Sequence, residues 1–215
     1  MTDFLNKEVT IHLLLCSETQ VMKQILIISA HPDPESFCTA LAQSYYKGVL
    51  TSGAEVDLIN LSELKFNPIL KYGYHNRTEL EPDLIEAQKK IQAANHLVFV
   101  YPTWWGTFPA LLKGFIDRVF LPGFAFQYKE DSVFWEKKLK GKSARLITTM
   151  DSPKWYYRFV YGNAGHHAMK KAFLNFCGVR PVKVTSFQTI KTSTAKKREQ
   201  WLAQTEKLGF KDSSS

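Results

Sequence analysis

The sequence predicts an α/β domain with a doubly wound, five-stranded parallel sheet and helices on both faces. Three observations lead to this prediction. Short apolar runs rich in β-branched residues recur along the chain, as in strands that are covered on both faces. Segments with helical spacing of apolar residues separate these runs, which favours parallel strands joined by right-handed crossovers. Finally, 215 residues suffice for one well-buried domain and are too few for two full ones.

Five short runs are expected to form the strands. The first, ILIISA, has the uninterrupted apolar character of a strand that is covered on both faces. The later runs are also short and contain several β-branched residues. In chain order, the five are ILIISA (25–30), EVDLIN (55–60), HLVFVY (96–101), SARLITT (143–149) and VKVTSF (182–187).

The segments between and after the strands carry signals for helices. Ser36 is a good N-cap for the first helix, which is expected to run to about Leu50. Pro82 suits the first position of the second helix, and Asp83 lies near the positive end of its dipole. The remaining helices are expected at 109–120, 163–177 and 194–208, with Gly209 as the cap of the last.

The working domain is expected to span residues 22–210. Met22 directly precedes the first strand, so residues 1–21 are interpreted as an N-terminal extension. The chain ends in a run of serines, and we therefore expect a disordered tail at 211–215. The apolar run at 11–16 is far too brief to cross a bilayer, so no stable membrane insertion is expected.

Charge and cysteine content indicate a cytoplasmic protein. A signal peptide would carry positive charge before its apolar run, whereas Asp3 and Glu8 accompany a single Lys7 here. The three cysteines form no CxxC pair, which favours reduced thiols. The formal net charge is +8, but the basic residues are scattered and lack regularly interleaved aromatics, so no nucleic-acid partner is expected.

The predicted topology locates the functional site. In an open parallel sheet, ligands bind beyond the carboxyl ends of the strands, at the switch point in strand order. The loops that follow the first, third and fourth strands are HPDPESF (31–37), PTWWGTF (102–108) and TMDSPKWYY (149–157). Trp104 and Trp105 stand side by side in the second loop, where a ligand wall is more plausible than a misplaced core.

The first of these loops offers groups that suit an anion. It contains neither GxGxxG nor GxxxxGK[ST], the fingerprints of dinucleotide and nucleoside-triphosphate loops. His31 follows the strand and Ser36 stands at a helix N-terminus, where unpaired amides favour a phosphate. Ser36 could also act as an N-cap alone, and His31 could bond a backbone carbonyl. A metal site built from His31, Asp33 and Glu35 is a weaker alternative, and we expect no metal.

Several segments together resemble a known family. They are ISAHPDPESF, YPTWWGTFPALLKGFIDRVFLPGFAF, ITTMDSPKWYY and FCGV. In combination they are similar to the NAD(P)H:quinone oxidoreductase family, the DT-diaphorase-like branch of the flavodoxin-like flavoproteins, over residues 23–207. The resemblance implies a flavodoxin-like fold, a homodimer and NAD(P)H as co-substrate. It also implies a bound flavin, FAD or FMN, and the His-Pro…Ser-Phe form of the first loop favours FAD.

The resemblance further implies which residues bind the flavin. One group would surround its phosphate, a second would line the isoalloxazine ring with backbone amides facing the ring's polar edge, and a third would close over the pyrimidine end. In that order, they are His31, Ser36, Phe37 and Cys38; Pro102, Thr103, Trp104, Trp105 and Gly106; and Thr148, Thr149 and Met150. The two indoles would form a flat apolar slot that admits a nicotinamide or a quinone in turn.

Two catalytic residues are also implied. Tyr156 matches the family tyrosine that serves the pyrimidine end of the flavin. In the animal enzymes a histidine follows that tyrosine by six residues and shares its proton relay, but Gly162 occupies that position here. His166 or His167 could substitute for it, and we take His166 as the candidate. Both histidines could instead simply begin a helix.

The resemblance predicts an enzyme that reduces quinones or similar acceptors by ping-pong, two-electron hydride transfer through the flavin. Azo compounds, nitro compounds or free flavins are alternative acceptors. An electron carrier is disfavoured because flavodoxins of that kind are usually acidic and this chain is basic. An NAD(P)H-responsive regulatory subunit of a membrane transporter is a further alternative.

Overall fold

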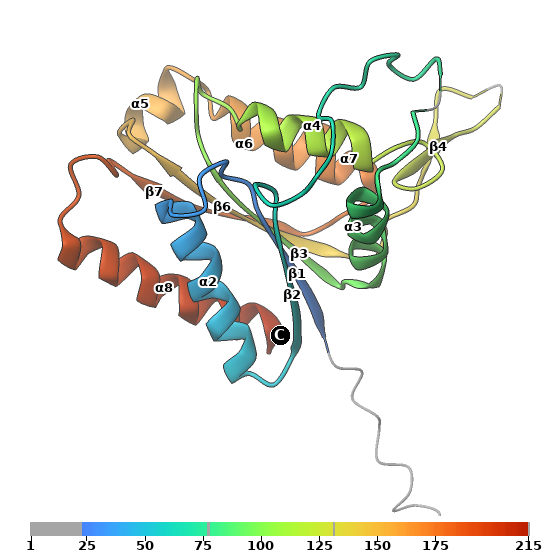
Figure 1. Cartoon of the computed structure of the whole chain (residues 1–215). Helices are drawn as coiled ribbons and strands as arrows, with labels where there is room; N and C mark the ends of the chain where they lie inside the picture. The colour runs from blue at the N-terminus through green and yellow to red at the C-terminus, as the bar shows by residue number, and fades with distance from the viewer. Residues whose placement is uncertain (1–22, 77, 131, 215) are drawn as a thin grey trace, which may run out of the picture.

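The computed structural model describes residues 23–214 except 77 and 131, and its centre is a five-stranded parallel sheet (Figure 1). The strand order is β2-β1-β3-β6-β7, so the chain changes direction across the sheet between β1 and β3. All five strands were predicted, and the doubly wound class is confirmed. Their bounds are Gln24–Ser29 for β1, Glu55–Asn60 for β2, His96–Pro102 for β3, Ser143–Met150 for β6 and Val182–Gln188 for β7.

Helices cover both faces of the sheet (Figure 1). One face carries α2 and α8, and the other carries α3, α4 and the run formed by α6, η1 and α7. A separate short helix, α5, follows β6. The bounds are Phe37–Thr51 for α2, Pro82–Ala93 for α3, Ala110–Val119 for α4, Lys154–Phe159 for α5, Ala164–His167 for α6, Ala168–Leu174 for the π-helix η1, Asn175–Cys177 for α7 and Ala195–Ser213 for α8.

Alternation along the strands divides the core into two layers. Ile25 and Ile27 of β1 pack toward α2 and α8, whereas Leu26 and Ile28 pack toward the opposite helices. All four side chains are at most 1% exposed. Because successive strand side chains point to opposite faces, an apolar run without alternation is what a doubly covered strand requires.

The last helix differs from the prediction. Gly209 was expected to cap it, but α8 continues to Ser213 and Gly209 lies inside it. A Cβ at Gly209 would lie 2.2 Å from the carbonyl oxygen of Tyr45. The glycine therefore allows α2 and α8 to approach closely, as Gly48 does from the α2 side, where a Cβ would lie 1.9 Å from the Glu206 oxygen.

The expected disordered tail at 211–215 is corrected for residues 211–213, which belong to α8. Asp212 is only 2% exposed. It accepts hydrogen bonds from Arg145, including one of 2.9 Å from Nη2, and a 2.9 Å bond from the Tyr45 hydroxyl. The buried Arg145 guanidinium and Tyr45 hydroxyl, both far from Asp212 in the sequence, hold the end of the helix in place.

Two features of the described chain were not predicted. Strands β4, Phe126–Tyr128, and β5, Trp135–Lys137, form an antiparallel pair outside the main sheet. Each has only three residues, too few for a periodic signal. Helix α5 was expected to be a loop. The predicted extension at 1–21 lies outside the described residues, and within the described part no helix is long and apolar enough to cross a membrane.

Candidate active site

The carboxyl ends of β1, β3 and β6 meet at the switch point of the sheet, as the topology predicted. A cavity of about 210 Å³ lies there between the three loops. Nine of the residues that the resemblance assigned to flavin binding line it, together with Asp151 and Ile190. The nine are His31, Ser36, Phe37, Cys38, Pro102, Thr103, Trp104, Thr149 and Met150.

The imidazole of His31 is oriented by its own loop. Its Nδ1 accepts a 3.0 Å hydrogen bond from the backbone N–H of Asp33. An accepting ring nitrogen carries no proton, so the neutral ring bears its hydrogen on Nε2 and can donate it to a ligand. The ring also meets Trp104 edge to face, with the centroids 5.4 Å apart. Among the described residues, no three His, Cys, Asp or Glu side chains are grouped so as to hold a metal ion.

The N-terminus of α2 provides further donors. Ser36 is its N-cap, as predicted, and Ser36 Oγ accepts from the N–H of Thr39 at 3.2 Å. Ser36 Oγ also lies 3.1 Å from Thr39 Oγ1, and either hydroxyl can donate in that contact. The first N–H groups of a helix have no acceptor within it, so the amides of Phe37 and Cys38 also face outward at its positive end. This donor set fits a phosphate.

Cys38 and Thr149 form the floor of the cavity. Cys38 Sγ lies 3.1 Å from Thr149 Oγ1, and both side chains are buried. Burial raises the pKa of the Cys38 thiol to about 12, although its hydrogen bond with Thr149 opposes this shift. The group is therefore a neutral thiol at physiological pH and packs as a small apolar side chain.

The tryptophan loop is a tight turn. Trp104 and Thr107 exchange backbone hydrogen bonds of 2.8 and 3.0 Å, and the two residues between them have positive φ, 51° for Trp105 and 76° for Gly106. Positive φ at both central positions defines a type I′ turn, which favours glycine. A Cβ at Gly106 would also lie 3.1 Å from the Tyr161 ring.

Of the loop amides that were expected to face a flavin, some donate within the protein and others do not. The N–H of Thr103 donates to the Thr149 oxygen at 2.7 Å, and that of Trp104 donates to Thr107. These two are occupied within the protein. Within the described chain, the amides of Trp105 and Gly106 donate to no protein acceptor, so they are the ones that remain for a ligand. The Trp105 side chain is 99% exposed at the tip of the turn.

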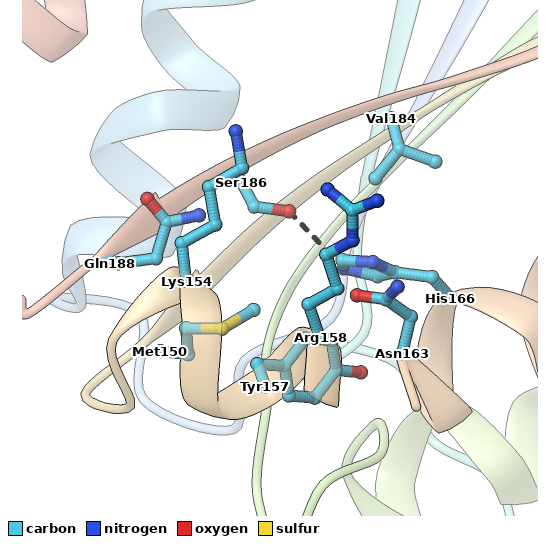
Figure 2. Close-up of a pocket in the computed structure, with 9 residues that line it drawn as sticks. All are labelled: Met150, Lys154, Tyr157, Arg158, Asn163, His166, Val184, Ser186 and Gln188. Carbon is cyan, nitrogen blue, oxygen red and sulfur yellow. Dashed lines mark hydrogen bonds between the residues drawn. The ribbon is translucent and has the colours of Figure 1, made fainter. Parts of the chain in front are cut away.

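A second cavity, of about 460 Å³, lies beside the first between α5, α6 and β7 (Figure 2). Met150 lines both cavities. The other residues around the second cavity are Lys154, Tyr157, Arg158, Asn163, His166, Val184, Ser186 and Gln188.

A polar network connects this cavity to the tryptophan turn. Tyr157 donates its hydroxyl to the Gly106 carbonyl at 3.1 Å and accepts from the Gly165 amide at 3.1 Å. The His166 ring lies against Tyr157, with centroids 4.9 Å apart, and its Nε2 is 3.2 Å from Ser186 Oγ. Burial lowers the pKa of His166 to about 4, so the ring is neutral at pH 7.

Some predicted site residues do not line the first cavity, namely Trp105, Gly106, Thr148, Tyr156 and His166. Thr148 lines neither cavity; its hydroxyl donates to Ser186 Oγ at 2.8 Å and lies 3.3 Å from His166 Nε2, as part of the network beside the second cavity. Tyr156 lines neither cavity; it is 36% exposed and packs against Trp155 and Tyr161. Tyr157, which the sequence did not single out, lines the second cavity; which of two adjacent tyrosines faces inward depends on the orientation of α5, a helix that was not predicted.

Comparison with known proteins identifies the family. A family model described as "Flavodoxin-like fold" matches residues 23–208. The chain belongs to this family. The resemblance and the fold class are both confirmed by this match and by the relatives below.

Relatives and solved structures agree with this assignment. A Haemophilus influenzae protein named "uncharacterized NAD(P)H oxidoreductase" is 33% identical over 77% of this chain and 83% of its own length. The NAD(P)H dehydrogenase (quinone) 1 of Cavia porcellus is 30% identical over 73% of this chain, but the match spans only 65% of that longer protein. A crystal structure from Streptococcus mutans is 32% identical, with a TM-score of 0.75 over 87% of this chain and 99% of that one.

Proposed function

We propose that the protein is a flavin-dependent NAD(P)H:acceptor oxidoreductase that reduces quinones in two alternating half-reactions. The observation that carries this proposal is the cavity at the ends of β1, β3 and β6, whose donors and apolar walls suit a flavin. The names of the relatives, NAD(P)H oxidoreductase and NAD(P)H dehydrogenase (quinone), support the reaction class. The bound flavin would supply the hydride chemistry.

The residues of the chain would bind and orient the ring. His31 Nε2–H, the Ser36 hydroxyl and the first amides of α2 would hold the phosphate. The Trp105 and Gly106 amides would donate to the polar edge of the ring. Reduction gathers negative charge near that edge, and fixed donors aimed at developing charge stabilise it without reorganisation. Trp104, which is 44% exposed, would exclude water from one wall.

We propose FAD as the flavin. Next to the phosphate donors, Phe37 packs against Trp201 with ring centroids 6.1 Å apart, and the Arg198 guanidinium lies 5.9 Å from the Phe37 ring. Arg198 also donates to the carbonyl of Ile190, a residue of the cavity. An aromatic and cationic surface at this place could support an adenine nucleotide beyond the phosphate, a part that FMN lacks.

The purified protein is therefore expected to be yellow, with about one flavin per chain. Absorbance after heat release gives the stoichiometry, and chromatography of the supernatant separates FAD from FMN. Recovered FMN would contradict the choice of FAD but keep the flavin. A colourless protein that takes up neither added FAD nor added FMN would overturn the proposed function.

Turnover identifies the acceptor. We expect NAD(P)H oxidation to depend on an added quinone, with initial rates that give parallel lines in double-reciprocal plots, as alternating half-reactions require. Azo dyes, nitro compounds and free flavins tested in the same assay would rank the alternative acceptors. Intersecting lines would contradict the ping-pong scheme while leaving the reaction class intact.

We further propose that the chain forms a homodimer through the apolar surface beside the site. This surface is defined by Trp105, Trp155, Phe159 and Val160, which are 99%, 61%, 74% and 58% exposed. An apolar patch of this kind on a soluble domain marks an interaction site. It borders the tryptophan turn, so a partner bound there would close the open side of the ring slot.

Light scattering at assay concentrations is expected to give twice the chain mass. The double substitution Trp155→Ser/Phe159→Ser should shift the protein toward the monomer and lower turnover. Leu50→Ser is the matched control, because it changes an exposed apolar side chain that lies on α2, and it should leave the mass unchanged. A fully active parental monomer would contradict the proposed dimer.

A further inference from the structure

The second cavity has a positive lining. Figure 2 shows the side chains of Lys154 and Arg158 extending from α5 across the cavity toward β7. Tyr157, Asn163, Ser186 and Gln188 are neutral polar residues of its lining, and no carboxylate is among the lining residues. His166 is neutral at pH 7 because it is buried. The cavity therefore offers two cations and several neutral hydrogen-bonding groups.

One of these two cations has an aromatic neighbour, because the Arg158 guanidinium lies 5.4 Å from the centroid of the Phe159 ring. Neither Lys154 nor Arg158 forms an ion pair with a described carboxylate. The nearby carboxylate of Asp151 belongs to the first cavity and accepts from the Lys191 amide at 2.7 Å. An anionic ligand in the second cavity would therefore not have to displace a described carboxylate.

The helical spacing of α5 separates these cations from the proposed dimer surface. Lys154, Tyr157 and Arg158 are three and four residues apart and line one cavity, so they share a face of the helix. Trp155 and Phe159 are also four residues apart and are largely exposed. One face of α5 can thus meet a partner chain while the other faces the cavity.

The position of the cavity connects it to the redox site. Met150 lines both cavities, and Tyr157 donates to the Gly106 carbonyl in the turn that follows Trp104, a residue of the first cavity. A group held by Lys154 and Arg158 would therefore lie in the cavity next to the bound ring, across the shared Met150.

We propose that Lys154 and Arg158 form an anion subsite that holds the phosphate, carboxylate or sulfonate of a substrate whose redox ring reaches the flavin. This inference rests on the proposed function. The anion has two possible sources, the phosphates of the nicotinamide co-substrate or an acidic group on the acceptor. Charge-assisted hydrogen bonds at such a place distinguish an anionic substrate from a neutral one of the same ring system.

Pairs of substrates, one anionic and one neutral, distinguish the two possible sources of the anion. NADPH is compared with neutral N-benzyl-1,4-dihydronicotinamide as the donor, and 1,4-naphthoquinone-2-sulfonate with 1,4-naphthoquinone as the acceptor. For Lys154→Gln/Arg158→Gln, we expect KM to rise about tenfold for the anionic member of one pair, and less than twofold for its neutral member. The control Lys47→Gln/Lys89→Gln removes the same charge from exposed positions on α2 and α3 and should change neither pair.

The outcome decides both the subsite and its ligand. A rise confined to NADPH identifies the co-substrate, and a rise confined to the sulfonate identifies an acidic acceptor. Unchanged KM for both anions, or an equal rise for neutral and anionic members, overturns the subsite. Calorimetric titration with NADP⁺ and with the sulfonate gives a reading that is independent of turnover. If the parent protein contains no flavin but binds NADP⁺ or the sulfonate, and the variant loses this binding, then the proposed function is refuted and the subsite is retained.

Discussion

A chain that ends at Lys211 is expected to lose about 3 to 5 kcal/mol of its free energy of unfolding, because it leaves Arg145 without its buried partner. Asp212 is 2% exposed and Arg145 is 5% exposed. The Tyr45 hydroxyl also donates to the Asp212 carboxylate, and Lys23 donates to the backbone carbonyl of Asp212, so the truncation removes several interactions at once. Domains of this kind are stable by about 5 to 15 kcal/mol in total, so the loss would be a large fraction.

Urea unfolding followed by circular dichroism measures this loss. The point substitution Asp212→Ala should reproduce most of it, whereas a chain ending at Ser213 keeps Asp212 and should resemble the parent. Asp117→Asn is the matched control, since Asp117 pairs with Lys113 on the surface of α4, where such pairs contribute roughly 0.5 kcal/mol. An equal free energy of unfolding for the parent and the chain ending at Lys211 would mean that Asp212 does not stabilise the fold.

The difference should also depend on pH. Burial alone would raise the pKa of Asp212, but the hydrogen bonds and charge of Arg145 outweigh it and lower the pKa to about 2. A carboxylate whose pKa is lower in the folded state stabilises the fold above its unfolded pKa of about 4. This contribution is lost as the pH falls through the folded pKa. The gap between the parent and Asp212→Ala is therefore expected to narrow from about pH 4 to pH 2.

Asp212 also illustrates what the sequence could not predict about the fold. The strands and most helices follow from local patterns, because a doubly covered strand must be apolar on both faces and a helix start needs a cap such as Ser36. The end of α8 depends on Arg145, 67 residues away in the sequence. Gly209 carries the same local signal whether it caps a helix or lets two helices touch. Only the contact with Tyr45 distinguishes the two.

The candidate site, too, could be predicted from the sequence only in part. Its three loops could be located because topology alone brings strand ends together. Which amides of the tryptophan loop remain for a ligand depends on the turn between Trp104 and Thr107, and that turn depends on a positive φ at Trp105. The choice between Tyr156 and Tyr157 depends on the orientation of a six-residue helix, which periodicity cannot set.

Tyr157→Phe is expected to slow the reduction of the flavin by NADPH about 10- to 100-fold while the flavin content stays the same. The substitution keeps the ring and its packing but removes the hydroxyl that donates to the Gly106 carbonyl and accepts from the Gly165 amide. The Trp105–Gly106 turn would then be held less firmly. A small displacement of donors that stabilise developing charge lowers the rate of the chemical step more than it weakens binding. Stopped-flow absorbance measures this half-reaction apart from product release.

Tyr156→Phe is the matched comparison, because it deletes the same group one residue earlier, on a side chain that is 36% exposed and lines neither cavity. We expect its rate of flavin reduction to stay within about twofold of the parent, since an exposed hydroxyl that leaves no buried partner unsatisfied costs little. The reverse result, a slow Tyr156→Phe beside a normal Tyr157→Phe, would support the tyrosine that the family resemblance assigned. In that case Tyr156 itself would reach the ring, and Tyr157 would serve only to pack α5 against α6. If both variants reduce flavin at the parental rate, neither hydroxyl contributes, and the Trp105 and Gly106 amides must stabilise the reduced ring without support from either.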